Sequence, residues 1–167
     1  MTFRTLSRLA VLLCILVAAA PAAPRVFRAA AVKVDVTPAG PQWLLGYQAR
    51  QSTGVRDRLY HRVLALDDGK TEFVLASSDF AETSPSFYDD FARELKQRAA
   101  VEPVRFWWTM THTHSAPELG PAGIPELFLG ERYKHDWDHA YAKEVREKLV
   151  AAVKEALSSP WFDFEKE

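Results

Sequence analysis

Two histidines that follow an aromatic run place the strongest constraint on how this chain can fold. The run Val104–Met110 contains aromatic and β-branched residues without polar alternation, which predicts a strand covered on both faces. His112 and His114 lie just beyond it, and side chains two positions apart share one face of a strand. The chain must therefore build a covered sheet with two imidazoles at one strand end. Such a pair indicates a metal site or a site that polarises a carbonyl group, and the structural alternative is a hydrogen-bonded histidine pair at a strand end.

The remaining patterns predict an α/β fold in which a mixed β-sheet is flanked by helices. Alternating valines predict a strand over 29–36. Apolar runs at 59–66 and 73–78 are joined by an Asp-Gly step, which is typical of a hairpin turn. A Ser-Pro pair starts a predicted helix over 85–99, because serine caps a helix and proline suits its first turn. A second amphipathic pattern predicts a helix over 134–157.

The composition excludes one large class of partners. With 167 residues, 48% of them hydrophobic and 26% charged, the chain is an ordinary globular sequence long enough for one domain. Its formal net charge is −1, and it has no long cluster of lysine and arginine. Proteins that bind nucleic acid usually concentrate basic residues on one face. We therefore expect no nucleic-acid partner.

Residues 1–23 have the pattern of a secretory signal peptide. Two arginines precede an apolar segment at 9–17, and small residues suited to cleavage follow it. A membrane anchor is the alternative, but the apolar segment is much shorter than the ~20 residues that cross a bilayer. We expect no transmembrane span once the signal peptide is removed. The single cysteine, Cys14, would leave with the leader. The mature protein, residues 24–167, is expected to be secreted or periplasmic and to contain no disulfide.

Zinc is the cofactor that the histidine pair would suit. Imidazole is a common zinc ligand, and bound zinc lowers the pKa of its water to about 7 and polarises acyl oxygens. His112 and His114 could both be ligands, or one could bind zinc while the other hydrogen-bonds a substrate oxygen. The hydroxyl groups of Thr111, Thr113 and Ser115 are candidates to orient the two rings.

Other polar residues offer alternative sites. Asp79 ends an apolar strand, where its carboxylate could orient a histidine or accept a hydrogen bond from the backbone. His135 and His139 are one helical turn apart in the predicted helix and could form a metal site with His61. No glutamate follows His135, so the His-Glu-x-x-His pattern of metalloproteases is missing. A solvated helix face is the simpler interpretation of that pair.

Five segments together resemble the N-terminal part of the neutral/alkaline, non-lysosomal ceramidase family, in matching order and separation. They are Ala31–Pro38, Leu45–Tyr47, Thr53–Tyr60, Ser77–Asp79 and Thr111–Pro117. The resemblance spans about residues 29–157, and its specific part is the segment that contains the two histidines. It implies that residues 24–167 are the N-terminal portion of a larger catalytic domain, and that the fold is an incomplete piece of that domain.

The resemblance also implies an activity. Members of that family hydrolyse the amide bond of ceramide, an N-acyl lipid, with a zinc ion held by two histidines, a glutamate and a tyrosine. By resemblance His112 is the first zinc ligand, and His114 contacts the substrate near the scissile amide. The other ligands and a serine-containing catalytic segment would belong to the missing remainder of the domain, so the isolated chain is expected to be inactive. The chain departs from the family at Arg56, where histidine is usual, and at Ala116, where glycine is common.

A non-enzymatic interpretation is open on the sequence alone. Trp161, Phe162 and Phe164 lie near the C-terminus, with almost no chain after them to cover their rings. A secreted module, truncated or degenerate, could bind a partner through these exposed aromatic side chains.

Overall fold

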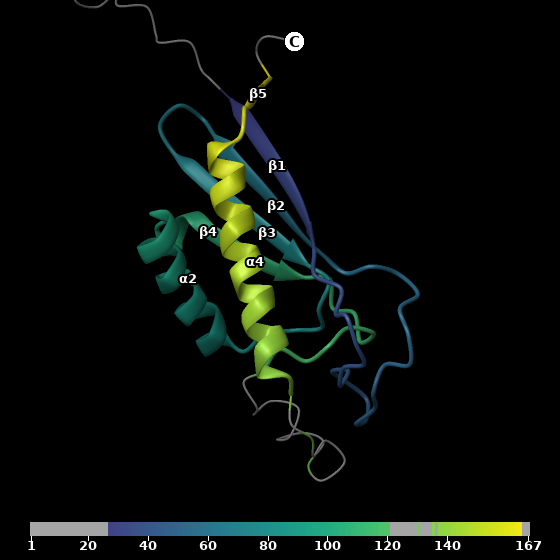
Figure 1. Cartoon of the computed structure of the whole chain (residues 1–167). Helices are drawn as coiled ribbons and strands as arrows, with labels where there is room; N and C mark the ends of the chain where they lie inside the picture. The colour runs from purple at the N-terminus through teal and green to yellow at the C-terminus, as the bar shows by residue number, and fades with distance from the viewer. Residues whose placement is uncertain (1–26, 121–129, 131–134, 136, 165–167) are drawn as a thin grey trace, which may run out of the picture.

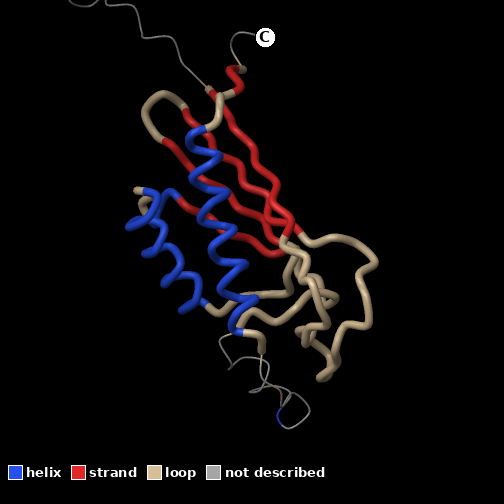
Figure 2. Tube along the Cα trace, in the orientation of Figure 1, coloured by secondary structure: helices blue, strands red, loops and turns tan. Residues whose placement is uncertain are grey.

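A mixed β-sheet with helices on one face forms the part of the chain that the structure describes (Figures 1 and 2). The structure is a computed structural model, and it describes residues 27–120, 130, 135 and 137–164. In chain order its elements are β1 (Arg28–Asp35), β2 (Tyr60–Asp67), β3 (Glu72–Ser78), α2 (Pro85–Ala99), the 3₁₀ turn η1 (Pro103–Arg105), β4 (Phe106–Met110), α4 (His139–Ser158) and β5 (Phe162–Asp163). The predicted signal peptide and most of the loop after Gly120 lie outside these ranges.

The predicted hairpin forms the centre of the sheet. Strands β2 and β3 pair antiparallel, and Gly69 adopts a φ of 81° in the turn between them. The carboxylate of Asp67 accepts a hydrogen bond from the Gly69 amide (2.7 Å), and that of Asp68 accepts one from the Thr71 amide (2.8 Å). Aspartate side chains stabilise turns in this way. The Asp-Gly step therefore fixes the register of the pair.

The other strands complete a mixed sheet in the order β4-β3-β2-β1-β5. Strand β1 pairs antiparallel with β2, and the two-residue β5 pairs antiparallel with the start of β1. Strand β4 pairs parallel with β3, after a connection through α2. Strands β1, β3 and β4 thus run in the same direction and end on the same side. This confirms the predicted fold class.

Local signals explain where the helices begin. The Ser84 hydroxyl accepts a hydrogen bond from the Phe87 amide (3.2 Å), which caps α2 at the predicted residue. Helix α4 begins at His139, five residues later than predicted, because Asp138 is its N-cap and accepts a hydrogen bond from the Tyr141 amide (2.9 Å). The predicted i, i+4 pair of His135 and His139 therefore does not lie on one helix.

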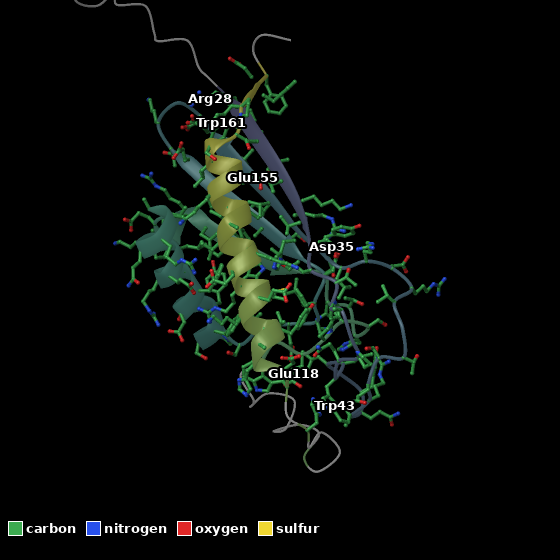
Figure 3. The ribbon with its side chains drawn as sticks, in the orientation of Figure 1. Arg28, Asp35, Trp43, Glu118, Glu155 and Trp161 are labelled. Carbon is green, nitrogen blue, oxygen red and sulfur yellow. The ribbon has the colours of Figure 1, made fainter. Side chains whose placement is uncertain are left out.

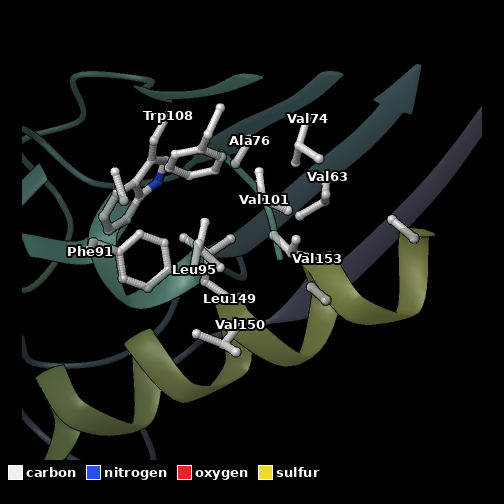
Figure 4. Close-up of a cluster of buried hydrophobic side chains, with 14 of the residues drawn as sticks. Val63, Val74, Ala76, Phe91, Leu95, Val101, Trp108, Leu149, Val150 and Val153 are labelled. Carbon is white, nitrogen blue, oxygen red and sulfur yellow. The ribbon is translucent and has the colours of Figure 1, made fainter. Parts of the chain in front are cut away.

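The main hydrophobic core lies between the helices and one face of the sheet (Figure 4). Phe91 and Leu95 of α2 meet Leu149 and Val153 of α4, and all four side chains are fully buried. The Phe91 ring centroid lies 4.8 Å from that of Trp108 on β4. Burying side chains of this size contributes roughly 1.5–3 kcal/mol each. The helices are therefore held by their apolar faces.

The prediction that β4 is covered on both faces is wrong. Phe106 and Trp108 point into the core, but Trp107 between them is 61% exposed. Strand β4 lies at the edge of the sheet, and both described helices cover the opposite face from Trp107. An aromatic run without polar alternation does not by itself show that both faces are buried.

The two ends of the sheet differ. Loops from several strands gather where β1, β3 and β4 end, and Trp43 and Glu118 lie there (Figure 3). At the opposite end the Arg28 guanidinium lies 5.2 Å from the half-buried Trp161 ring, and Phe162 and Phe164 are about half exposed. None of the helices in the described ranges combines the length and the apolarity needed to cross a membrane.

Candidate metal and substrate site

The two histidines of the predicted site lie in a loop rather than on the strand. Strand β4 ends at Met110, and the Thr111 amide donates a last hydrogen bond to the carbonyl of Ser78 on β3 (3.0 Å). His112 then adopts a φ of 58°, in the left-handed region that side chains other than glycine seldom occupy. This turn brings the rings of His112 and His114 together, with centroids 4.9 Å apart and planes at 74°.

Each imidazole is held through Nδ1 by a backbone carbonyl. His112 Nδ1 lies 2.9 Å from the oxygen of Ala81, and His114 Nδ1 lies 3.0 Å from the oxygen of Leu45. A carbonyl oxygen only accepts hydrogen bonds, so these partners assign the proton to Nδ1 in both rings. In the neutral form each ring then keeps its lone pair on Nε2. Metal-binding histidines are commonly oriented in this way.

Gly46 and Tyr47 fit closely around the His114 ring. A Cβ atom at position 46 would lie 1.9 Å from His114 Nδ1, and Gly46 has a φ of 109°, so only glycine is compatible with this approach. The Tyr47 ring centroid lies 4.6 Å from that of His114. Arg50 adds a hydrogen bond from its guanidinium to the His114 carbonyl (2.6 Å). The segment that contains Leu45 therefore clamps His114 on several sides.

The site is open to solvent. His112 and Ser115 are exposed, and His114 is half buried. Beside them is a cavity of about 650 Å³, which Thr113 and Ser115 line together with residues 37–41 and 50–57. Cavities of roughly 300–1,000 Å³ are typical of small-molecule sites. Neither imidazole lines this cavity, so the cavity adjoins the histidine loop through Thr113 and Ser115.

Hydroxyl groups do not orient the rings as the sequence suggested. The Thr113 hydroxyl accepts a hydrogen bond from the Ser115 amide (3.2 Å) and so shapes the loop. Thr111 contributes its backbone amide to the link with β3. Among the described residues, the carbonyls of Ala81 and Leu45 take the orienting role instead. Sequence reasoning missed them because every residue carries a carbonyl.

Asp79 takes the second of its two predicted roles. Its carboxylate accepts a hydrogen bond from the Tyr60 amide (3.0 Å) and two from the Arg62 guanidinium (2.8 and 2.9 Å). These bonds tie the end of β3 to β2, because Tyr60 and Arg62 belong to that strand. Asp79 thus supports the framework beneath the histidine loop and does not contact either imidazole through a described hydrogen bond.

The alternative metal site does not form. His61 is fully buried, with Nδ1 2.6 Å from the Ser78 hydroxyl oxygen and Nε2 3.0 Å from the Val145 carbonyl. His135 Nε2 instead contacts the carboxylate of Glu118 (2.7 Å). The His139 ring packs on Trp137 (3.8 Å between centroids). Across the described ranges no three histidine, aspartate, glutamate or cysteine side chains form a group that could hold a metal ion.

A buried contact that the sequence did not indicate joins the loops next to the site. The side chains of His135 and Glu118 are 2% and 4% exposed, and the His135 ring stacks on Trp43 with centroids 4.6 Å apart. The Glu118 amide donates to the Trp43 carbonyl (3.0 Å), and Leu44 forms a β-bridge with Pro117. These contacts hold the segment that carries Leu45 against the segment that carries His114.

The two departures from the ceramidase pattern have different surroundings. The Arg56 side chain is 97% exposed and lies 3.9 Å from the Asp57 carboxylate, in the loop that borders the cavity. Ala116 is fully buried, and its carbonyl accepts a hydrogen bond from the Leu45 amide (3.2 Å). The first departure therefore changes the charge at the rim, and the second adds a methyl group that the core encloses.

Comparison with solved structures shows which known proteins have a similar fold. The chain is similar to the neutral ceramidase from Pseudomonas aeruginosa, with a TM-score of 0.63, 17% identity, and coverage of 81% of this chain and 22% of that one. It is also similar to a structure described as a ceramidase complexed with C2, with a TM-score of 0.56, 16% identity, and coverage of 80% and 21%. No protein-family model matches the sequence, and no curated protein matches it at the sequence level. The chain therefore has the fold of about one fifth of a neutral ceramidase.

Proposed function

We propose that this chain carries part of the active site of a zinc-dependent amidohydrolase of the neutral ceramidase type. In its complete form the enzyme would hydrolyse the amide bond of ceramide or a related N-acyl lipid to a sphingosine-like amine and a fatty acid. One observation carries the proposal: both His112 and His114 donate Nδ1–H to a backbone carbonyl and keep Nε2 available. The fold likeness to two ceramidase structures supports it.

The two imidazoles would have different roles. By the resemblance to the ceramidase family, His112 would hold zinc through Nε2, and it is the more exposed residue of the two. His114 Nε2 would accept a hydrogen bond from an N–H or O–H group of the substrate beside the scissile amide. Zinc, when bound, polarises a carbonyl oxygen and lowers the pKa of a bound water. The carbonyls of Ala81 and Leu45 would keep both rings in the required tautomer.

Two imidazoles are too few for a catalytic zinc centre. Such centres usually have three protein ligands and one open position, and the described residues offer no group of three ligands. The chain spans about one fifth of the length of the ceramidases it resembles in structure. We propose that the remainder of a catalytic domain supplies the other ligands, so that the chain alone binds zinc weakly and shows little or no turnover.

The proposal includes a location. Residues 1–23 would direct export, and the protein would act in the periplasm or outside the cell, where it would meet its lipid-like substrate. Nucleic acid is not among the proposed partners, because the net charge is −1 and the sequence has no basic cluster.

Zinc titration tests the proposal directly. We expect calorimetry on the full chain to show weak binding at one zinc per chain, lost in His112→Ala and retained in the matched control His139→Ala. His139 is suitable because it is exposed and contacts Trp137 rather than the site. A fluorescent ceramide should show no turnover with the chain alone.

Two results would contradict the proposal. Loss of zinc binding in His139→Ala but not in His112→Ala would move the metal elsewhere. Absence of zinc binding under all conditions would favour the non-enzymatic module, for which the half-exposed Phe162 and Phe164 are the relevant surface.

A further inference from the structure

Ser78 joins a buried side-chain network to the loop that carries His112. It is the last residue of β3 and is fully buried. Its hydroxyl oxygen lies 2.6 Å from His61 Nδ1 and accepts a hydrogen bond from the Trp108 indole N–H (2.7 Å). The three side chains come from β3, β2 and β4, so the contact joins three adjacent strands. Trp108 itself packs in the main core (Figure 4).

The direction of these hydrogen bonds follows from the chemistry of the groups. An indole N–H can only donate, so the Ser78 oxygen accepts from Trp108 and its hydroxyl proton is free to donate to His61 Nδ1. His61 then carries its proton on Nε2, which donates to the Val145 carbonyl in α4 (3.0 Å). The chain of donors and acceptors is complete, and a fully satisfied buried network holds its members in one arrangement.

The main chain of Ser78 connects this network to His112 by two routes. Its carbonyl accepts hydrogen bonds from the amides of Thr111 (3.0 Å) and Phe80 (2.9 Å). Thr111 immediately precedes His112, and Phe80 immediately precedes Ala81, whose carbonyl holds His112 Nδ1 (2.9 Å). The backbone before His112 and the acceptor for its ring therefore both depend on the position of one peptide group.

We propose that His61, Ser78 and Trp108 form a positioning network for His112, and that none of them contacts substrate or metal. The network fixes the peptide of Ser78, which in turn sets the φ of His112 and the distance from its Nδ1 to the acceptor. This inference rests on the function proposed for His112. A network that served only the stability of the core would have no specific effect on the His112 ring.

Nuclear magnetic resonance of the imidazole nitrogens tests the proposal on the full chain. Ser78→Ala removes the hydroxyl, and Trp108→Phe keeps an aromatic ring but removes the N–H donor together with part of the buried indole. Val74→Ala is the matched control, because Val74 is a buried β3 residue with no part in the network. We expect the first two variants to lose the Nδ1–H form of His112, and to weaken zinc binding about 10- to 100-fold, as supporting partners of metal ligands typically do.

The outcomes separate this proposal from the proposed function. The Val74→Ala protein should be less stable and still keep the wild-type His112 tautomer. If wild-type His112 shows the Nδ1–H form and zinc does not bind, the zinc function fails while the tautomer measurement still tests the network. If either network variant folds and retains the wild-type His112 tautomer and zinc affinity, the positioning role is overturned. Should Ser78→Ala not fold, Trp108→Phe decides the question alone.

Discussion

Acidification from pH 7 to pH 5 is expected to destabilise this protein mainly through one buried histidine. His61 is fully buried, and that burial lowers its pKa to about 4. The positive charge of Lys148 acts in the same direction, whereas the hydrogen bond to Val145 and the charge of Asp79 oppose it. In the unfolded chain the same imidazole has an ordinary pKa near 6.5. The folded state therefore prefers the neutral ring.

The sign and the size of this change in the free energy of unfolding follow from proton linkage. Well above pH 6.5 both states carry neutral His61, and its effect on stability does not vary with pH. As the pH falls below 6.5 the unfolded chain binds a proton that the folded protein does not bind until about pH 4. Each pKa unit corresponds to roughly 1.4 kcal/mol. The expected loss is about 2 kcal/mol at pH 5 and about 3 kcal/mol at pH 4.

Urea denaturation at pH 7 and pH 5 measures this loss, and His61→Asn provides the control. The Asn oxygen can still accept from Ser78, but the side chain does not titrate. Asp35 does not interfere with the measurement between pH 7 and pH 5. It accepts hydrogen bonds from Thr37 and Arg58 and has a pKa of about 2, so its contribution to the free energy of unfolding is lost only below about pH 4. If wild type and His61→Asn lose the same free energy of unfolding between pH 7 and pH 5, the reasoning about His61 is refuted.

Two further changes probe the loop and a helix end. Gly46→Ala should cost about 1–3 kcal/mol and displace the His114 ring, since it combines a strained φ with a clash at Nδ1. Gly40→Ala is its control, because a Cβ there meets no atom within 4 Å, and equal losses in the two variants by urea denaturation would contradict the clash argument. Ser84→Ala should cost about 1 kcal/mol by removing the N-cap of α2, measured by thermal unfolding, whereas Ser84→Asp should restore most of it.

Much of the fold could be predicted because its signals are local. The Asp-Gly turn and the Ser84-Pro85 start of α2 each depend on a few neighbouring residues, and both are confirmed. On α4, Glu144 and Lys148 lie one helical turn apart and form an ion pair at 2.7 Å, which is again a local interaction. The exposure of Trp107 could not be predicted in the same way. It depends on β4 lying at an edge of the sheet and on both described helices covering one face.

The two histidine side chains of the candidate site could be predicted from the sequence, but the groups that orient their rings could not. His112 and His114 stand out because two imidazoles close together are uncommon, and the structure brings their rings within 4.9 Å. The groups that orient them are backbone carbonyls, which have no sequence signature. Gly46 was the one available signal, since a glycine beside a site often marks a close backbone approach. His61 shows the opposite problem, because a buried structural histidine and a ligand look alike in a sequence.

Backbone strain in the described chain is concentrated around the imidazole pair. Three residues other than glycine have positive φ in the described part of the chain, and one of them, Ala100, ends α2 in the left-handed conformation. The other two are His112 and Tyr47, which flank the site from different loops. Strained residues persist only where their surroundings determine them. Here the hydrogen bonds to the carbonyls of Ser78 and Ala81 hold the His112 backbone and ring, and packing against His114 holds Tyr47. The two imidazole rings are therefore arranged before a ligand binds, which lowers the entropic cost of binding.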